Sequence, residues 1–403
     1  MKNVQYGSLF SQLLSLFNRN DFSRHVRDLD AEYRSKGFSC WDQFVSMLFC
    51  HLAQAKSLRE ITMGLKSSAG RLSHLGMSAS PKRSTLSYAN AHRTWELYER
   101  LFYDLLQTCK AVAPKHKFRF KNKLMSIDSS VIELCIEMFD WAKYRKAKGA
   151  AKLHLVLDHD GYLPVFADLT EGKQADVNIA NKLQFAPGTI VVMDRGYIDY
   201  SLFERWTEQG VFFVTRTKKN TDYYWLPRQK KRPPKGLVRF DKLVTLNAFN
   251  CACDRKCKSV LRVVRVWVEE KQEEMEFITN NLTLAASTIA AIYKERWQIE
   301  LFFKALKQNL KIKTFVGTSY NAVQIQLWTA LICILLLKYL QFRSTCSWHL
   351  SNLVALLRLN LFTYRDLWRW ISDPYETPPL RPPNEQPMLP GFDLGQHHME
   401  TSG

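Results

Sequence analysis

The stretch "IYKERWQIELFFKALKQ", residues 292–308, decides how this chain is interpreted, because two periodic patterns run through one predicted helix. At about 100° per residue, four polar side chains project within roughly 60° of one another: they are Tyr293, Arg296, Glu300 and Lys307. A neighbouring stripe is apolar, as expected of a face that packs on a core; it comprises Ile292, Ile299, Phe303, Leu306 and Leu310. The polar stripe is either a surface of paired charges or a functional face.

Composition favours a globular protein with a polyanionic partner. The chain has 403 residues, of which 46% are hydrophobic and 24% charged, enough for two to four domains. Lys and Arg number 57 against 38 acidic residues, which gives a formal net charge of +19. Nucleic acid is the leading candidate partner. An anionic membrane surface is the competitor, although no basic amphipathic helix stands apart from the rest.

Three other features predict a cytoplasmic protein that does not span a membrane. The longest apolar run, "LWTALICILLL" at 327–337, is too short for a bilayer and is predicted to be a buried core helix. The N-terminus has no signal-peptide cleavage pattern. Nine cysteines, mostly scattered in apolar context, fit a reducing compartment. Only Cys251, Cys253 and Cys257 cluster, and without a nearby fourth ligand they are predicted to be free thiols rather than a zinc site.

The order of predicted elements indicates a helical N-terminal region followed by a mixed α/β sheet. Residues 1–112 follow helical periodicity, with "SLREITMGL" and "STLSYANAHRTWELYERLFYDLL" resembling a helix-turn-helix in which Lys82, Arg83 and Arg93 meet DNA. A plain helical bundle explains the same pattern equally well. Further on, the sequence predicts a hairpin around Asp160-Gly161, a buried strand in "TIVVMDRGYI", a helix and another strand.

Two aspartates each follow a short apolar strand: Asp128 in "LMSIDSSV" and Asp194 in "VVMDRGY". Either alone reads as an ordinary turn residue. Together with Glu300 they form a trio whose mutual repulsion would be relieved by two Mg²⁺ ions, with Mn²⁺ as a substitute. Such a two-metal site supports in-line cleavage or joining of phosphodiesters. Arg296 and Lys307 would then hold DNA phosphates, and Tyr293 would add a hydroxyl contact or stack on sugar and base.

The motifs around these residues resemble those of a known family. "IDSS", "VVMDRGY" and the Y-x2-R-x3-E-x6-K pattern are similar to those of the DDE transposases of the bacterial insertion-sequence-four family. The resemblance implies that Asp128, Asp194 and Glu300 are the catalytic metal ligands. It also implies that the DNA end is held by Tyr293, Arg296 and Lys307, with Arg216 as a further phosphate contact and Trp297 helping to displace a base.

The resemblance also implies a domain organisation around a ribonuclease H-like mixed-sheet catalytic core. The expected parts are a helical DNA-binding domain at 1–112, the core at 113–220 and 283–345, a β-rich insertion at 221–282, a helical region at 346–372 and a disordered, proline-rich tail at 373–403.

The implied activity is cut-and-paste transposition of an insertion sequence, in which the element's terminal inverted repeats are cleaved and joined to target DNA. Two ends joined in concert imply at least a dimer in the DNA complex. Relatives hold a flipped base on a tryptophan, but the matching position falls near Met275, which leaves Trp267 and Trp225 as candidates. Two alternatives stay open: an inactive or domesticated DNA-binding derivative, and a nuclease without strand transfer.

Overall fold

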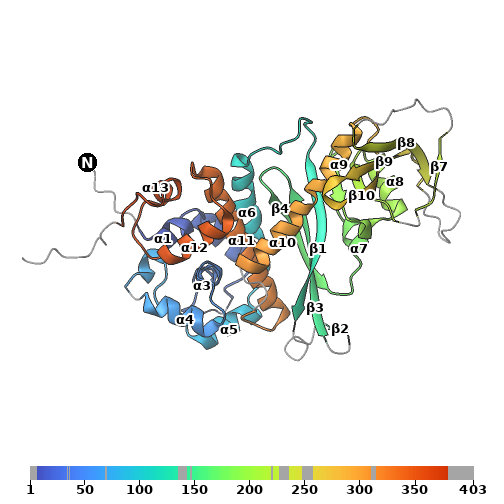
Figure 1. Ribbon diagram of the computed structural model, residues 1–403. Helices are drawn as coiled ribbons and strands as arrows, with labels where there is room; N and C mark the ends of the chain where they lie inside the picture. Colours follow the sequence, from blue (N-terminus) through green and yellow to red (C-terminus); the bar gives the residue numbers. More distant parts are fainter. Residues whose placement is uncertain are drawn as a thin grey trace, which may run out of the picture.

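The strands form a single ten-stranded mixed sheet, which lies to one side of the N-terminal helices and has helices on both of its faces (Figure 1). The structure is a computed structural model and describes residues 7–33, 35, 37–68, 70–134, 143–145, 148–218, 221–226, 236–246, 257–309 and 315–379. Its strands are β1 (Leu124–Leu134), β2 (Lys143–Arg145), β3 (Lys148–Asp158), β4 (Leu163–Glu171), β5 (Ile190–Met193), β6 (Phe212–Arg216), β7 (Tyr223–Trp225), β8 (Val238–Leu246), β9 (Leu261–Val268) and β10 (Glu273–Thr279).

The first half of the sheet has the order β4-β3-β1-β5-β6. The three strands β4, β3 and β1 are antiparallel, whereas β5 is parallel to β1 and β6 is parallel to β5. The predicted hairpin is confirmed: β3 and β4 meet at a turn where Gly161 takes a φ of 69°. The predicted buried strand is β5, in which every residue is buried.

The predicted β-rich segment after residue 220 extends this same sheet instead of forming a separate one. Strand β10 pairs antiparallel with β6, and β9, β8 and β7 follow outward in that order. This pairing brings the end of the segment back beside the middle of the sheet. The chain can therefore enter its next helices next to β5 and β6. Cys251 and Cys253 lie outside the described residues, and Cys257 is buried.

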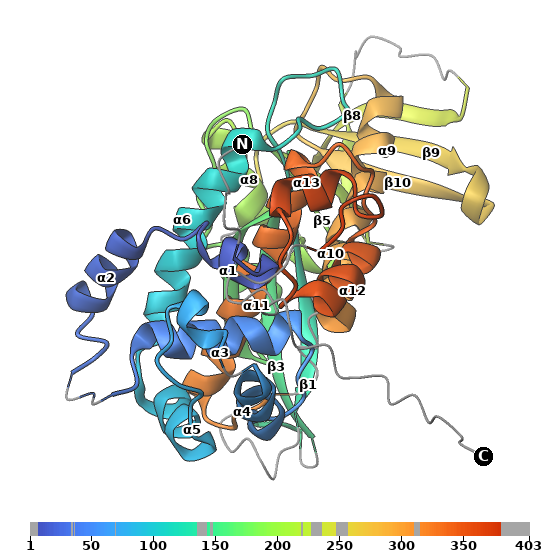
Figure 2. The same cartoon turned by 90° about the vertical axis from the view of Figure 1, so that its left-hand side faces the viewer.

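The N-terminal helices and the C-terminal helices share one core. The former are α1 (Leu9–Leu14), α2 (Arg19–Asp28), α3 (Cys40–Leu52), α4 (Leu58–Ser67), α5 (Arg83–His92) and α6 (Glu96–Val112), and the latter are α11 (Tyr320–Arg343), α12 (Leu350–Asn360) and α13 (Leu367–Ser372). Helix α11 packs against α3, α5 and α6, and Figure 2 shows it enclosed among them. The predicted continuous helix from residue 84 to 106 is wrong, because extended backbone at Arg93 (ψ 140°) separates α5 from α6.

Helix α11 is longer than its apolar run predicted. It has 24 residues, and among the described residues it is the one helix long and apolar enough to cross a membrane, yet 89% of its most apolar window is buried against the rest of the protein. Its two early glutamines are buried and bonded: Gln326 accepts a hydrogen bond from the Val316 N–H, and Gln324 donates one to the Tyr320 hydroxyl. Hydrogen bonding removes most of the cost of burying these amides, and the helix serves as a core element here.

The opening stretch of sequence forms two helices rather than one. Helix α9 (Ala286–Glu295) covers one face of β5 and β6, and α10 (Trp297–Asn309) crosses β1. On the opposite face, α7 (Asp176–Ala180) and α8 (Tyr200–Glu208) cover β1, β5 and β6. At Arg296 the helix tightens into i to i−3 hydrogen bonds, so the break falls inside the polar stripe. The apolar stripe is buried as predicted at Ile292, Ile299, Phe303 and Leu306, while Leu310 lies outside the described residues.

Candidate active site

The register of two parallel strands brings the two aspartates together. Ile127 of β1 is paired with Met193 of β5, so the residues that follow, Asp128 and Asp194, leave this pair at the same level of the sheet. Glu300 comes from the first turn of α10, which packs across β1. Two strands and one helix thus carry the three predicted carboxylates into one region of the molecule.

One arginine joins two of these carboxylates. The guanidinium of Arg296 donates from Nη1 to Asp128 Oδ2 at 3.2 Å and from Nη2 to Glu300 Oε1 at 2.5 Å. Charge-assisted bonds of this kind are among the stronger polar contacts in proteins. Arg296 itself is largely buried, and its Nε atom has no hydrogen-bond partner in the described part of the chain. The arginine therefore supplies the positive charge between Asp128 and Glu300.

The surroundings of Asp128 make its charged form costly. Burial, reinforced by the neighbouring carboxylates of Glu300 and Asp194, raises the pKa of Asp128 to about 6, although the Ser129 N–H and Arg296 act in the opposite direction. The Ser129 amide donates to Asp128 Oδ1 at 2.8 Å. A carboxylate in this state gains from any additional cation that approaches it.

The three carboxylates offer hard oxygen donors, the ligand type preferred by divalent cations such as Mg²⁺. Across the described ranges, however, no three Asp, Glu, His or Cys side chains lie close enough together to hold one ion. Asp128 and Glu300 are held around Arg296, and Asp194 lies within electrostatic range of Asp128. The donor chemistry fits a divalent cation, and the arginine holds two of the donors in the present arrangement.

A cleft beside this cluster contains the other end of the polar stripe. It has a volume of about 450 Å³ and is lined by Asp128, Ser130, Glu300, Lys304 and Lys307, among others. Lys307 Nζ donates to the Ser130 hydroxyl at 2.6 Å and to the Val131 carbonyl at 3.0 Å, which fixes α10 to β1. The cleft thus combines two carboxylates with two lysines.

A second, slightly larger pocket is lined in part by Arg296. It has a volume of about 480 Å³, and its lining includes Trp267, Met275, Phe277, Tyr293 and Trp297. Tyr293 packs against the Phe277 ring with centroids 4.9 Å apart, and Trp297 is 55% exposed. A wall of aromatic rings beside a cation suits a flat, polar ring system such as a nucleobase.

The remaining residues predicted to contact DNA lie at different distances from the aromatic pocket. Arg216 ends β6 and lies 3.6 Å from Glu273, close enough to Tyr293 for an electrostatic interaction. Trp267 lines the aromatic pocket, whereas Trp225 packs on Phe240 at the far edge of the sheet. Met275, near which the position of the family's tryptophan is expected to fall, also lines the pocket. Of the two candidate tryptophans, Trp267 is therefore the one beside the site.

Sequence reasoning missed the contacts that Asp176 makes behind the site. Asp176 accepts hydrogen bonds from the Ser129 hydroxyl at 2.7 Å and from Lys152 Nζ at 3.3 Å, and so holds the residue next to Asp128. The available signal was a lysine at position 152 and His154 on an otherwise apolar strand. His154 Nδ1 lies 3.5 Å from the same carboxylate.

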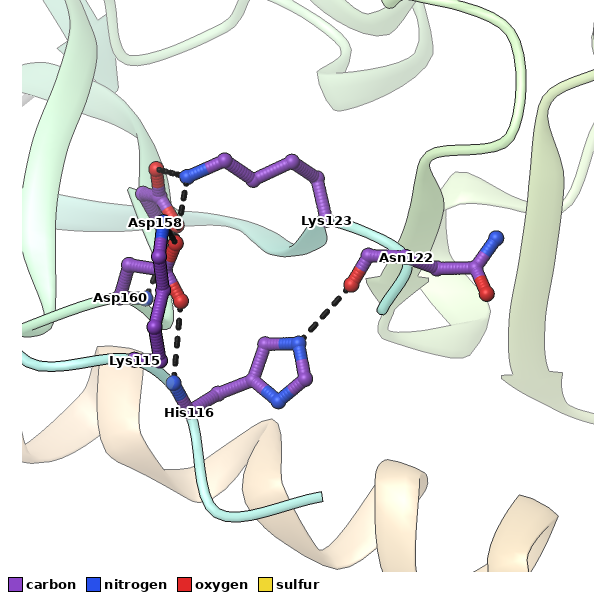
Figure 3. Close-up of polar contacts among 6 residues, drawn as sticks. All are labelled: Lys115, His116, Asn122, Lys123, Asp158 and Asp160. Atoms are coloured by element: carbon purple, nitrogen blue, oxygen red, sulfur yellow. Dashed lines mark hydrogen bonds and ion pairs between the residues drawn. The ribbon is translucent and has the colours of Figure 1, made fainter. Parts of the chain in front are cut away.

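A second supporting network fastens the segment that precedes β1. Figure 3 shows Lys115, His116 and Lys123 bound to the turn between β3 and β4 through the buried carboxylates of Asp158 and Asp160. Burial opposes ionisation, but the bonds from Lys123, the His116 N–H and Lys115 together lower the pKa of Asp160 to about 2.

This network continues to the break between α9 and α10. Lys117 Nζ lies 2.5 Å from Glu295 Oε1, and the Tyr162 hydroxyl donates to Glu295 Oε2 at 3.2 Å. Glu295 is buried and directly precedes Arg296. The contacts anchor the helix break from two sides.

Carboxylates from two strands and a helix beside a cleft that contains two lysines are typical of enzymes that act on phosphodiesters, and comparison assigns the family. The profile described as a transposase DDE domain matches residues 119–336, and the chain belongs to the DDE transposase family. It is a DNA transposase. Transposase DDE domains generally use divalent metal ions. A second profile, described as a domain of unknown function, matches residues 5–78.

Two individual relatives agree with this assignment. A Sinorhizobium fredii protein named transposase y4zB is 30% identical over 312 residues, covering 76% of this chain and 84% of its own. A Geobacillus stearothermophilus protein named for a transposase of insertion sequence element IS5377 is 29% identical, covering 64% and 67%. Among solved structures, a piggyBac transposase synaptic complex with hairpin DNA covers 98% of this chain and 89% of that chain, with a TM-score of 0.45 and 9% identity.

Proposed function

We propose that this transposase carries out cut-and-paste transposition with Asp128, Asp194 and Glu300 as its catalytic residues. The observation that carries the proposal is the convergence of the two aspartates, in register on β1 and β5, with the glutamate of α10. Arg296, which bonds Asp128 and Glu300, and Lys307, which lines the cleft beside them, come from the same stripe of sequence. Carboxylates gathered in this way are costly unless they bind something.

The proposed core is ribonuclease H-like and the proposed subgroup is the insertion-sequence-four family. The strand order β4-β3-β1-β5-β6, with three antiparallel strands followed by two parallel ones, supports this core. The Y-x2-R-x3-E-x6-K pattern supports the subgroup. The proposed location is the bacterial cytoplasm, at the nucleoid.

The proposed metal is Mg²⁺, two ions per site, with Asp128, Asp194 and Glu300 as ligands. When bound, such a pair activates the attacking oxygen and stabilises the leaving oxygen of a phosphodiester. The chain's own cations then have a second task. Arg296 and Lys307 would hold the phosphates that flank the reacting bond, since both present charged donors beside the carboxylates.

The proposed substrate is a duplex that ends at the element's terminal inverted repeat, and later the target duplex. Tyr293 and Trp297 lie in the aromatic pocket next to Arg296, which supports contacts to the terminal nucleotides and a place for a displaced base. Arg216 would contact a phosphate on the same side. Concerted joining of two ends requires two copies of the chain, so we expect a dimer on DNA.

The decisive experiment replaces Glu300 by Gln and measures cleavage of terminal-repeat DNA in Mg²⁺, together with binding in EDTA. Cleavage should be lost while binding is retained, because the change removes one ligand charge and keeps the side-chain shape. Glu208→Gln, an exposed change on α8, is the matched control and should cleave normally. Cleavage by Glu300→Gln at the wild-type rate would refute the site assignment.

A strand-transfer assay separates the proposed function from its alternatives. Joining of the cleaved end to a target plasmid is expected of a transposase. Cleavage without joining would identify a nuclease. Binding without cleavage by the wild-type chain would identify an inactive derivative.

A further inference from the structure

The turn between β3 and β4 holds an aromatic residue in a backbone conformation that such residues rarely adopt. Tyr162 has a φ of 54°, and among the described residues it is the one aromatic side chain at a positive φ. Positions of this kind favour Gly, because a Cβ atom crowds the left-handed backbone. Strain persists only where the surrounding structure enforces it, and it is concentrated at functional positions. The reason for a tyrosine here must therefore lie in what its side chain contacts.

The surroundings leave this turn little room to relax. The neighbouring Gly161 also has a positive φ, and a Cβ atom there would lie 2.6 Å from the Phe342 ring of α11. On its other side, the turn is bonded to the start of β1, because Lys123 Nζ donates to the buried carboxylate of Asp160 at 2.6 Å (Figure 3). Tyr162 is thus carried by backbone that is fixed from two directions.

The Tyr162 hydroxyl reaches the residue that ends α9. It donates to Glu295 Oε2 at 3.2 Å, while Lys117 Nζ lies 2.5 Å from Glu295 Oε1. Glu295 is only 8% exposed, and a carboxylate at such a position needs partners of this kind. Burial and the Glu295 carboxylate raise the pKa of Tyr162 to about 12, so the hydroxyl remains a donor at neutral pH. The contact between Tyr162 and Glu295 therefore joins the fixed turn to the end of α9.

Glu295 immediately precedes the break that separates α9 from α10. At the break, the Arg296 N–H bonds the Tyr293 carbonyl, three residues back, at 3.1 Å. Hydrogen bonds of this 3₁₀ type have poorer geometry than those of an α-helix, and within a helical stretch they often mark a hinge. A change of angle at this hinge would move Arg296 and Glu300 together relative to Asp128. Contacts from outside the helix are therefore needed to fix the direction of α10.

We propose that Tyr162 is a positioning residue for DNA cleavage, which acts through Glu295 to set the direction of α10. The direction of α10 determines where Glu300 lies relative to Asp128. The inference rests on the proposed function and deepens it, since neither Tyr162 nor Glu295 is a proposed metal ligand. Displacement of a catalytic group by about 1 Å can lower a rate about 100-fold. A single hydroxyl behind the helix break can therefore control the rate of cleavage.

The test measures cleavage of a terminal-repeat duplex in Mg²⁺ under single-turnover conditions, with protein in excess over DNA. The maximal rate and the half-saturating protein concentration are determined for the wild type, Tyr162→Phe, Glu295→Ala, Glu295→Gln and the combination of Tyr162→Phe with Glu295→Ala. Tyr223→Phe is the matched control, because the Tyr223 hydroxyl also donates to a glutamate, Glu276, at 3.2 Å, at the far edge of the sheet. Thermal unfolding of each variant verifies that it folds.

Tyr162→Phe should lower the maximal rate about 10-fold, the factor expected for loss of one hydrogen bond to a charged group. The half-saturating concentration should stay unchanged, because the change removes no proposed DNA contact. Glu295→Ala should lower the rate further, since the Lys117 contact is lost as well, whereas Glu295→Gln retains an acceptor for the hydroxyl and should keep part of the rate. Tyr223→Phe should cleave as the wild type does.

The combined variant decides whether Tyr162 acts through Glu295. If it does, adding Tyr162→Phe to Glu295→Ala should cause no further loss of rate, because the two residues form one unit. A loss that is equally large with and without the Glu295 side chain would overturn the inference. A Tyr162→Phe rate equal to that of Tyr223→Phe would overturn it as well.

Hydrogen–deuterium exchange provides a second measurement, which needs no catalysis. If the hydroxyl holds the break, Tyr162→Phe should accelerate exchange of the backbone amides of residues 293–300 and leave α11 unchanged. A wild-type protein that never cleaves DNA would refute the proposed function. In that case faster exchange confined to residues 293–300 would still support the positioning role, and unchanged exchange there would overturn it.

Discussion

Replacing Arg296 by Ala should lower the thermal stability of the protein in the absence of metal. The same change should increase the stabilisation that Mg²⁺ provides. The arginine bridges Asp128 and Glu300, so its removal leaves two neighbouring carboxylates without their cation. The same removal frees those carboxylates for a divalent ion. The two effects have opposite signs and are separable by adding metal.

The size of the first effect follows from two charge-assisted hydrogen bonds, each worth about 1.5 kcal/mol at the low end of the usual range. The low end applies because the carboxylates of Asp128 and Glu300 are 18% and 32% exposed. Relief of the partnerless Arg296 Nε offsets part of the loss, which leaves about 2 kcal/mol. For 403 residues at about 2.1 cal/mol/K each, this corresponds to a Tm decrease of about 2 °C.

The size of the second effect follows from mass action. An ion present at about 100 times its Kd stabilises the folded state by about 2.7 kcal/mol, or about 3 °C on the same scale. In the wild type, metal must displace Arg296 from both carboxylates, so the gain should be smaller. Differential scanning calorimetry in EDTA and in Mg²⁺ measures both quantities.

Arg265→Ala provides the control, because it removes an ion pair with Glu276 at 2.8 Å on β9 and β10, outside the cleft. This variant should respond to Mg²⁺ as the wild type does. An Arg296→Ala protein whose Tm rises with Mg²⁺ no more than that of the wild type would refute the role of Arg296 as a competing cation.

Three further changes test other parts of the reasoning. Lys307→Ala should reduce the salt slope for terminal-repeat binding by about 0.9, as loss of one phosphate contact requires; an unchanged slope in fluorescence anisotropy would contradict this role. Burial lowers the pKa of His159 to about 4. Below about pH 6.5 the unfolded chain therefore binds a proton that the folded chain does not, and the free energy of unfolding decreases as the pH is lowered. The loss approaches about 3 kcal/mol at pH 4, and urea unfolding of His159→Asn should show a correspondingly weaker acid dependence. Gly161→Ala should destabilise the protein by about 1–3 kcal/mol, because φ is 69° and the new Cβ would lie 2.6 Å from Phe342 Cζ. Gly37→Ala, also at positive φ but with no atom within 4 Å, should lose less; equal losses would remove the steric part of the explanation.

Local pattern was sufficient to predict the parts of the fold that depend on local chemistry. The Asp160-Gly161 turn and strand β5 follow from turn residues and an uninterrupted apolar run. Pattern could not reveal that the segment after residue 220 joins the main sheet. That depends on hydrogen bonds between β6 and β10, such as those around Arg216 and Phe277, which lie far apart in sequence.

The features of the site that the sequence could not predict also depend on contacts between distant parts of the chain. Helical periodicity predicted one polar stripe, whereas the structure divides its residues between the cleft and the neighbouring pocket. It assumed one continuous helix, because the stretch contains neither Gly nor Pro at the break. The tight turn at Arg296 coincides with contacts from distant parts of the chain, Tyr162 and Lys117, to Glu295. No periodicity in the stretch itself could have indicated them.

The break explains how one short sequence can serve two cavities. If α9 continued unchanged into α10, Tyr293 and Glu300 would face the same direction. Instead, the two residues line different pockets. Arg296 lies at the junction, where it lines the aromatic pocket and bonds both carboxylates of the cleft. We infer that this position lets the guanidinium serve as counterion before metal and DNA arrive and as a phosphate contact afterwards. A lysine could neutralise the charge but could not make both bonds from one planar fork. The arginine is therefore required by geometry as well as by charge, and the opposing stability changes expected of Arg296→Ala follow from that double role.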